Sequence, residues 1–161
     1  MTPCEDPLEI PWDLSDWIDR YTLLDWVEEE VGKLDWNNPE LIEALRQEPD
    51  FRPRMLLTLV TYGHLTQVFG SEELEDKCYS DPVFRSICEG RQPEARDLAR
   101  FRRENRGLIK VLIAPVLLRA VRRHFSLEND LLPAGLKKFV VDNAVERLDF
   151  ARHMDCQITP E

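Results

Sequence analysis

The sequence predicts an all-α fold, a compact bundle of several helices, and three observations support this prediction. Apolar residues recur at spacings of three and four along most of the chain, which is the period of a helix with one buried face. The alternation typical of strands and the Asn-Gly or Asp-Gly pairs typical of hairpins are absent. Connections between the apolar segments are short. We therefore expect a single domain of about six to eight helices over residues 1–161, with loose ends at residues 1–12 and 155–161.

Composition and length limit the class of protein. The chain has 161 residues, of which 43% are hydrophobic, so it is long enough for one domain with a real core. Its first residues are acidic and lack the basic-then-apolar pattern of a secretory signal. The longest uncharged stretch, residues 55–71, contains His64, Gln67 and other polar side chains, so we expect a buried helix there and not a membrane span. These features predict a cytoplasmic protein with no membrane partner and no small-molecule partner.

The acidic N-terminal part, residues 13–50, is expected to form two helices. The first covers about residues 14–31, where apolar side chains follow helical spacing and Gly32 supplies a stop. The second begins at Asn38-Pro39, because asparagine is a favoured cap and proline fits the first helical turn.

The central part, residues 53–106, is expected to contain four helices. Pro53 opens the first of them, and its wide apolar face predicts the central helix of the core. Ser71 is expected to cap the second helix, and Asp81, which a proline follows, is expected to cap the third. The fourth helix begins after Pro93.

The C-terminal part, residues 107–153, is expected to form two long helices. The first covers about residues 108–124 and is strongly apolar, and Pro115 should kink or split it. Pro133 should open the second, which ends near His153. One core is expected to include apolar side chains from the central and C-terminal parts: Leu56, Leu59, Val60, Leu65, Phe84, Phe101 and Leu112.

Charge is distributed very unevenly along the chain. The formal net charge is −10, yet residues 96–125 hold nine basic and only two acidic side chains. Residues 1–50 show the opposite balance, with 15 acidic and 3 basic side chains. The basic segment is therefore the place where an anionic partner would dock, although the whole chain is acidic. Eight of its nine basic residues are arginine, whose planar guanidinium suits phosphates and guanine edges.

Six basic residues of this segment form the candidate DNA-binding site. They are Arg96, Arg100, Arg102, Arg103, Arg106 and Lys110. The spacing i, i+4, i+7 places Arg96, Arg100 and Arg103 on one helical face, and the other three follow on an adjacent face. Leu98 and Phe101 would anchor the opposite side in the core. A helix with a buried stripe and exposed arginines has the form of a recognition helix, so duplex DNA is the expected partner.

Two other interpretations of the basic segment stay open. A charged helical face is often only solvated. Alternatively, the chain is a protein-interaction or homodimerisation domain, in which the acidic residues 1–50 and the basic residues 96–125 pair across two copies or within one chain. Four tryptophans of the first forty residues could anchor such an interface, or they could clamp the first helix to the core: Trp12, Trp17, Trp26 and Trp36.

Catalytic and metal sites are not expected in this chain. Asp142, Glu146 and Asp149 share one helical face, but no Glu-x-x-His pair accompanies them, so a solvated face is the expected role. The four cysteines lack Cys-x-x-Cys spacing and the three histidines stand far apart, which argues against a zinc site or a disulfide framework. Cys78 and Cys88 are expected to be small core residues. We therefore expect no enzymatic activity, no metal and no cofactor.

Residues 51–106 carry an ordered set of motifs. They are Pro53, the apolar run from Met55 to Leu65 with Tyr62-Gly63, the segment from Ser71 to Glu75, Val83-Phe84-Arg85, and Arg100-Phe101-Arg102-Arg103. In this order the motifs resemble the N-terminal domain of bacterial DDE-class insertion-sequence transposases of the InsH-like type. The resemblance implies a helix-turn-helix-like module that recognises the terminal DNA of the element. It also implies that Arg100, Arg102 and Arg103 lie on or beside the DNA-facing helix.

The chain departs from this family pattern in two places. The family has serine and threonine at the start of its arginine-bearing helix, whereas residues 93–99 contain neither, and Glu94 disfavours a phosphate at that end. About 50 residues follow Arg106, and they read as helix, which leaves no room for a mixed α/β catalytic domain with three metal-binding carboxylates. The prediction is therefore a transposase-derived DNA-binding module without catalytic activity of its own.

The same reasoning predicts the behaviour of a triple variant. Exposed arginines contribute little to folding. We therefore expect that replacing Arg100, Arg102 and Arg103 together by alanine removes DNA binding and leaves thermal stability nearly unchanged.

Overall fold

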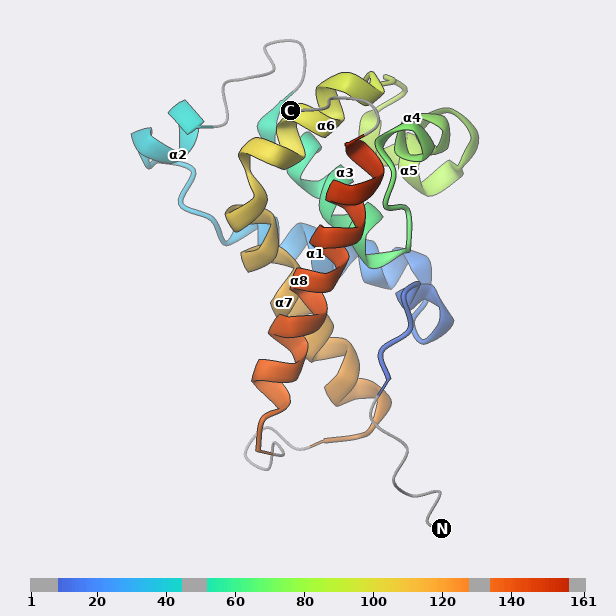
Figure 1. Cartoon of the computed structure of the whole chain (residues 1–161), viewed down its shortest axis with the longest axis vertical. Coiled ribbons are helices and arrows are strands. Elements are labelled where there is room, and N and C mark those ends of the chain that lie inside the picture. The colour runs from blue at the N-terminus through green and yellow to red at the C-terminus, as the bar shows by residue number, and fades with distance from the viewer. Residues whose placement is uncertain (1–8, 45–51, 128–133, 157–161) are drawn as a thin grey trace.

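The computed structural model describes residues 9–44, 52–127 and 134–156, and these residues form an all-α bundle (Figure 1). They contain eight α-helices, one short 3₁₀ helix and no strand beyond an isolated bridge between Asp13 and Thr66. The predicted fold class is therefore confirmed. None of the helices in the described part of the chain has the length and hydropathy that a membrane span requires.

The N-terminal part contains three helical elements instead of the two that were predicted. They are η2 (Leu14–Asp16), α1 (Arg20–Gly32) and α2 (Pro39–Ala44). The single helix expected from residue 14 was wrong, because two aspartates each start a helix. Asp13 caps η2 by accepting from the backbone of Ser15, and Asp19 caps α1 by accepting from two backbone N–H groups. The predicted stop at Gly32 and the start at Pro39 are confirmed.

The central part contains the four predicted helices, α3 (Pro53–Leu65), α4 (Ser71–Ser80), α5 (Pro82–Cys88) and α6 (Ala95–Glu104). Helix α3 packs against α1, α5, α6, α7 and α8, and Figure 1 shows it in the part of the bundle where these helices meet. Asp81 caps α5 as expected. The expected cap by Ser71 was wrong, because Gly70 holds the cap position and the Ser71 hydroxyl donates to Asp155 instead.

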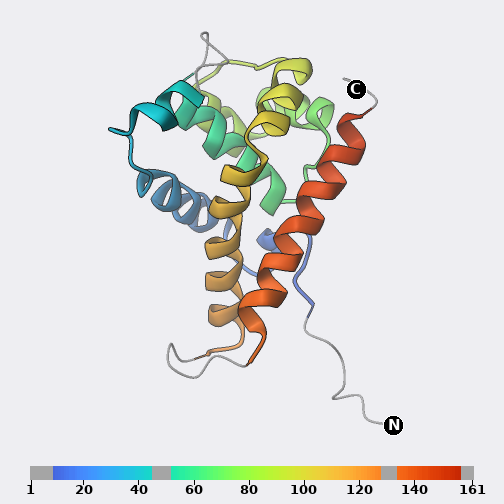
Figure 2. The same cartoon turned by 60° about the vertical axis from the view of Figure 1, so that its left-hand side comes forward.

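The C-terminal part forms two long antiparallel helices, α7 (Arg106–His124) and α8 (Leu136–Asp155). They lie side by side and extend away from the other helices (Figure 2). Helix α7 is not split at Pro115. This proline is exposed, so water can solvate the carbonyl that loses its helical hydrogen bond. Pro133 lies outside the described residues.

A single core joins the helices of the bundle. It contains all seven of the expected residues: Leu56, Leu59, Val60, Leu65, Phe84, Phe101 and Leu112. The tryptophans also pack within the chain. Trp17 stacks on the ring of His124 with centroids 3.9 Å apart, and Trp12 meets Phe150 edge to face at 5.1 Å. These contacts clamp the N-terminal segment to α7 and α8.

Arg147 on α8 anchors the first described residues of the chain. Its guanidinium is buried and donates to the carbonyls of Pro11, Trp12 and His64 at 2.7 to 2.8 Å. A fourth hydrogen bond joins it to Asn143. The expectation that the chain ends are loosely packed was therefore wrong for residues 10–12 and for residue 155, which is buried. Residues 1–8 and 157–161 lie outside the described part.

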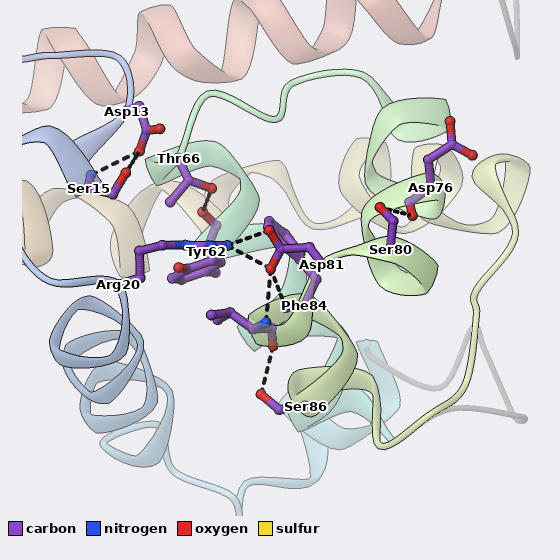
Figure 3. Close-up of polar contacts among 11 residues, drawn as sticks. Asp13, Ser15, Arg20, Tyr62, Thr66, Asp76, Ser80, Asp81, Phe84 and Ser86 are labelled. Carbon is purple, nitrogen blue, oxygen red and sulfur yellow. Dashed lines mark hydrogen bonds and ion pairs between the residues drawn. The ribbon is translucent and has the colours of Figure 1, made fainter.

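Asp81 connects α1 to the start of α5 (Figure 3). Its carboxylate accepts from Nη2 of Arg20 with both oxygens at 2.6 Å and also accepts from the backbone of Val83 and Phe84. Burial acts to raise the pKa of Asp81, but the hydrogen bonds from Arg20 and the backbone outweigh burial and hold the pKa below its usual value. This contact therefore joins the start of α5 to α1, and α5 in turn packs against α4.

Candidate nucleic-acid interface

Helix α6 is held against α4 at its first residue. The backbone N–H of Ala95 donates to the carboxylate of Glu75 on α4 at 2.7 Å, and Gln92 donates to the backbone carbonyl of Glu75. Leu98 and Phe101 face the core and are fully buried. The start of α6 therefore already holds a carboxylate, and a phosphate would have to be bound by side chains and not by this helix terminus.

Three of the predicted arginines share the outer face of α6. Arg96 and Arg103 are exposed, and Arg100 is half-buried with a 3.3 Å ion pair to Asp97 one turn away. The spacing i, i+4, i+7 predicted this shared face. We call Arg96, Arg100 and Arg103 the α6 stripe.

Arg102 lies inside the molecule, so its expected exposure was wrong. Only 5% of its surface is accessible, and it donates to Asp155 with Nη2 at 2.6 Å and with Nε at 3.2 Å. It also donates to the Phe69 carbonyl at 2.6 Å and to the Ser71 hydroxyl at 2.9 Å. The reason is helical geometry, since position 102 lies one turn after the buried Leu98.

The burial of Arg102 also overturns the expectation for the triple variant. Burial lowers the pKa of Arg102, and the carboxylate of Asp155 opposes this shift. A charge buried to this extent is destabilising unless it is paired, and removing it leaves the partner charge alone. Replacing Arg100, Arg102 and Arg103 together would therefore destabilise the fold, and loss of DNA binding in that variant would carry no information about the surface.

Arg106 and Lys110 belong to α7 and not to α6. The chain breaks helical geometry at Asn105, which ends α6 and precedes α7, so the predicted second face does not lie on one continuous helix. Both residues are half-buried, and Arg106 pairs with Asp149 of α8. The structure thus places three of the six predicted residues on the outer face of α6, one inside the bundle, and two at the start of α7.

The acidic N-terminal part pairs with the basic segment at a different place. Glu29 on α1 forms a 2.6 Å ion pair with Arg119 on α7. The guanidinium of Arg119 also lies over the ring of Trp26, 4.3 Å from its centroid. Within one chain, Glu29 of α1 therefore pairs with Arg119, which belongs to the basic segment but lies outside the α6 stripe.

The two cysteines expected in the core are buried, and two carboxylates of α8, Asp142 and Asp149, form ion pairs. Cys78 and Cys88 are buried free thiols with their sulfur atoms 3.1 Å apart, and the hydrogen bond between them together with burial raises the pKa of Cys78. Asp142 pairs with Lys138 one turn earlier at 2.9 Å. No group of three or more potential metal ligands occurs among the described residues.

His64 on α3 is a buried titratable group. The sequence predicted only that it lies in a buried helix. Its side chain has no accessible surface, and Nδ1 lies 2.6 Å from the carbonyl oxygen of Val60. Burial, followed by the positive charge of Arg102, lowers the pKa of His64 from 6.5 to about 3. The imidazole is therefore neutral in the folded protein at physiological pH.

This shift predicts a loss of stability in mild acid. Below pH 6.5 the unfolded chain takes up a proton at His64 that the folded chain refuses until about pH 3. The free energy of unfolding therefore falls as the pH falls through this window, by up to about 1.4 kcal/mol per pH unit. Urea denaturation of the wild type and of His64→Gln at several pH values between about 5 and 7 should give a shallower pH dependence for the variant. Parallel profiles would contradict the assignment.

Comparison with known proteins identifies the family of the chain. Curated proteins gave no match, and solved structures gave none. A family model described as "Transposase domain (DUF772)" matches residues 13–104. The matched region runs from the cap of η2 to the last residue of α6 and so includes the α6 stripe. Because the match covers more than half of the chain, this protein belongs to the transposase domain (DUF772) family.

Proposed function

We propose that this chain is a transposase-derived DNA-binding module, and that the α6 stripe contacts duplex DNA. The family membership supports a role associated with transposition. The proposal that the chain binds DNA rests on the arrangement of the α6 stripe. Arg96, Arg100 and Arg103 lie on the outer face of a helix whose inner face is buried in the core.

The surroundings of α6 support a recognition role. Helices α4, α5 and α6 follow each other with short connections, and α4 packs against both of the others. The turn before α6 contains Glu89 and Gly90 in left-handed conformations, and Glu89 ends α5 as its C-cap. A helix that is fixed by its apolar side and presents arginines outward meets the requirements of helix-turn-helix binding.

We expect the contacts to go mainly to the phosphate backbone. Arg106 and Lys110 at the start of α7 are half-buried, and they would add to the basic surface of the α6 stripe if the Arg106–Asp149 ion pair opens on binding. Glu75 already occupies the first backbone N–H of α6, so guanidinium groups and not the helix terminus would bind phosphate. Such contacts are independent of sequence and depend strongly on salt. The module would bind DNA in the cytoplasm, and catalysis is not assigned to it.

The proposal is tested by equilibrium binding of the purified chain to a fluorescent duplex at low salt. We expect saturable binding, and we expect the duplex to stay intact when Mg²⁺ or Mn²⁺ is added. Absence of binding at low salt would contradict the proposal. A homodimer that dissociates when the α6 stripe is neutralised, without any DNA binding, would support a homodimerisation domain instead. Metal-dependent cleavage that disappears when one carboxylate is changed would contradict the absence of catalytic activity.

A further inference from the structure

A cavity of about 200 Å³ lies where α3, α6, α7 and α8 meet, and its lining is strongly basic. Four arginines and a single carboxylate contribute to it, together with one histidine: Arg102, Arg103, Arg106, Arg152, Asp155 and His64. Arg103 and Arg152 are exposed and Arg102 is buried, so the positive charge extends from the surface to the floor of the cavity. This arrangement favours an anion.

Two buried residues of the lining each have a nitrogen without a hydrogen-bond partner among the described residues. These atoms are Nη1 of Arg102 and Nε2 of His64. The two side chains are 5% and 0% exposed. Buried polar atoms without partners are rare in folded proteins, and each one needs an explanation. Both residues line the same cavity, so one bound group could satisfy both nitrogens once the atoms that cover them shift slightly.

The chemistry of the two nitrogens defines that group. The carbonyl of Val60 can only accept, so Nδ1 of His64 carries the proton and Nε2 has a free lone pair. The arginines can only donate. The complementary ligand is therefore an anion with several acceptor oxygens and one hydroxyl that donates to His64. Inorganic hydrogen phosphate meets this description because it keeps one proton at neutral pH, and a phosphate monoester, whose second pKa lies near 6, meets it in mild acid. A phosphodiester and a sulfate carry no proton under either condition.

The size of the cavity agrees with this ligand. A water molecule occupies roughly 30 Å³ in the liquid, so a cavity of about 200 Å³ has room for several groups of that size. A tetrahedral phosphate fits together with some water. Arg152 at the exposed side comes from α8 and does not belong to the α6 stripe.

We propose that this cavity binds a single phosphate group that keeps one ionisable hydroxyl, such as inorganic phosphate or a phosphate monoester. Arg102, Arg103 and Arg152 donate to its oxygens, and neutral His64 accepts from its hydroxyl. Two sources could supply the group, namely free phosphate and the 5′-phosphate at the end of a DNA strand. The second source rests on the proposed function.

The first experiment uses inorganic phosphate alone. Calorimetric titration of the full chain near neutral pH should show saturable binding, and sulfate should bind about tenfold more weakly or worse. Arg152→Gln should weaken phosphate binding by at least about tenfold, because it removes a charge-assisted hydrogen bond. The matched control Arg96→Gln removes the same charge on α6 outside the cavity and should change the affinity less than about twofold.

Several results would overturn the site. These are the absence of saturable phosphate binding, and equal effects of Arg152→Gln and Arg96→Gln. His64→Gln should abolish the preference for phosphate over sulfate, and equal affinity of the wild type for the two anions would refute the hydrogen bond to His64. Arg152 is exposed, so its replacement leaves the fold intact, and circular dichroism of each variant verifies this.

The second experiment separates the two sources. Otherwise identical duplexes that end in a 5′-phosphate or a 5′-hydroxyl are compared near pH 6, where the terminal phosphate monoester is about half protonated. Tighter binding of the phosphorylated duplex that disappears in Arg152→Gln would assign the cavity to a strand end. Equal binding of both duplexes, with inorganic phosphate still bound, would assign it to free phosphate. Phosphate binding without any duplex binding would contradict the proposed function and leave the cavity assignment supported.

Discussion

Replacing Arg102 by alanine is expected to lower the free energy of unfolding by about 3 to 5 kcal/mol. The guanidinium of Arg102 is buried and joins three separate parts of the chain, since it donates to Asp155, to Ser71 and to the carbonyl of Phe69. Its removal leaves the buried carboxylate of Asp155 without a counter-charge. A loss of this size is a large fraction of the stability of an ordinary domain.

The neighbouring Arg103 supplies the control for this prediction. It is exposed, so Arg103→Ala should change the free energy of unfolding by less than about 0.5 kcal/mol. Urea denaturation followed by circular dichroism measures both variants. Replacing Arg102 and Asp155 together by apolar residues should cost less than the sum of the two single changes, because neither charge is then left alone. Equal stability of Arg102→Ala and Arg103→Ala would contradict the buried ion pair.

Replacing the three arginines of the α6 stripe by glutamine should weaken duplex binding roughly a hundredfold to a thousandfold at about 0.1 M salt. Each phosphate contact contributes through counterion release, and about one power of ten per contact follows at this salt concentration. The variant consists of Arg96→Gln, Arg100→Gln and Arg103→Gln. It keeps Arg102, so the ion pair with Asp155 stays intact.

A second triple variant separates local contacts from net charge. Lys137→Gln, Lys138→Gln and Arg122→Gln remove the same charge near the end of the α7–α8 pair that is remote from α6 (Figure 2). Duplex binding should then change by less than about tenfold, because screening weakens interactions beyond a Debye length. If both triple variants weaken binding equally, the effect comes from total charge and the α6 stripe is not the contact surface.

Local chemistry explains why most helix boundaries could be predicted. Pro39, Pro53 and Pro82 each begin a helix, as expected from the fit of proline to the first turn. Asp19 also caps a helix, but it lies within a stretch of continuous apolar spacing, and this spacing predicted one helix where the chain forms two elements. Asp13 and Asp19 are residues of a type that often caps helices, but the continuous apolar periodicity across them predicted a single helix.

For the candidate DNA-binding site, helical spacing predicted only which arginines of α6 share a face. Spacing placed Arg96, Arg100 and Arg103 on one face, and the position of Arg102 one turn after Leu98 was a signal of burial that the count of charges obscured. The partner of Arg102 is Asp155, 53 residues later in the chain. Such a pair arises from the packing of α6 against α8, which no local pattern contains.

The cavity depends even more on tertiary structure. His64, Arg102 and Arg152 come from three different helices, and their spacing in the sequence gives no sign that they line one cavity. The free nitrogen of His64 follows from the use of Nδ1 by the carbonyl of Val60. Only the packed bundle shows that this nitrogen and the guanidinium of Arg102 belong to one site.

The salt dependence of duplex binding tests the central claim most directly. Binding constants of the wild type and of the α6-stripe variant are measured over a series of salt concentrations, and the two log–log slopes are compared. If the stripe, Arg106 and Lys110 all contact phosphates, the wild type should have a slope of roughly −4 to −5, and the variant a slope smaller by about 3. Identical slopes for the two proteins, or no duplex binding at the lowest salt, would contradict the claim that this helix is the DNA-binding surface.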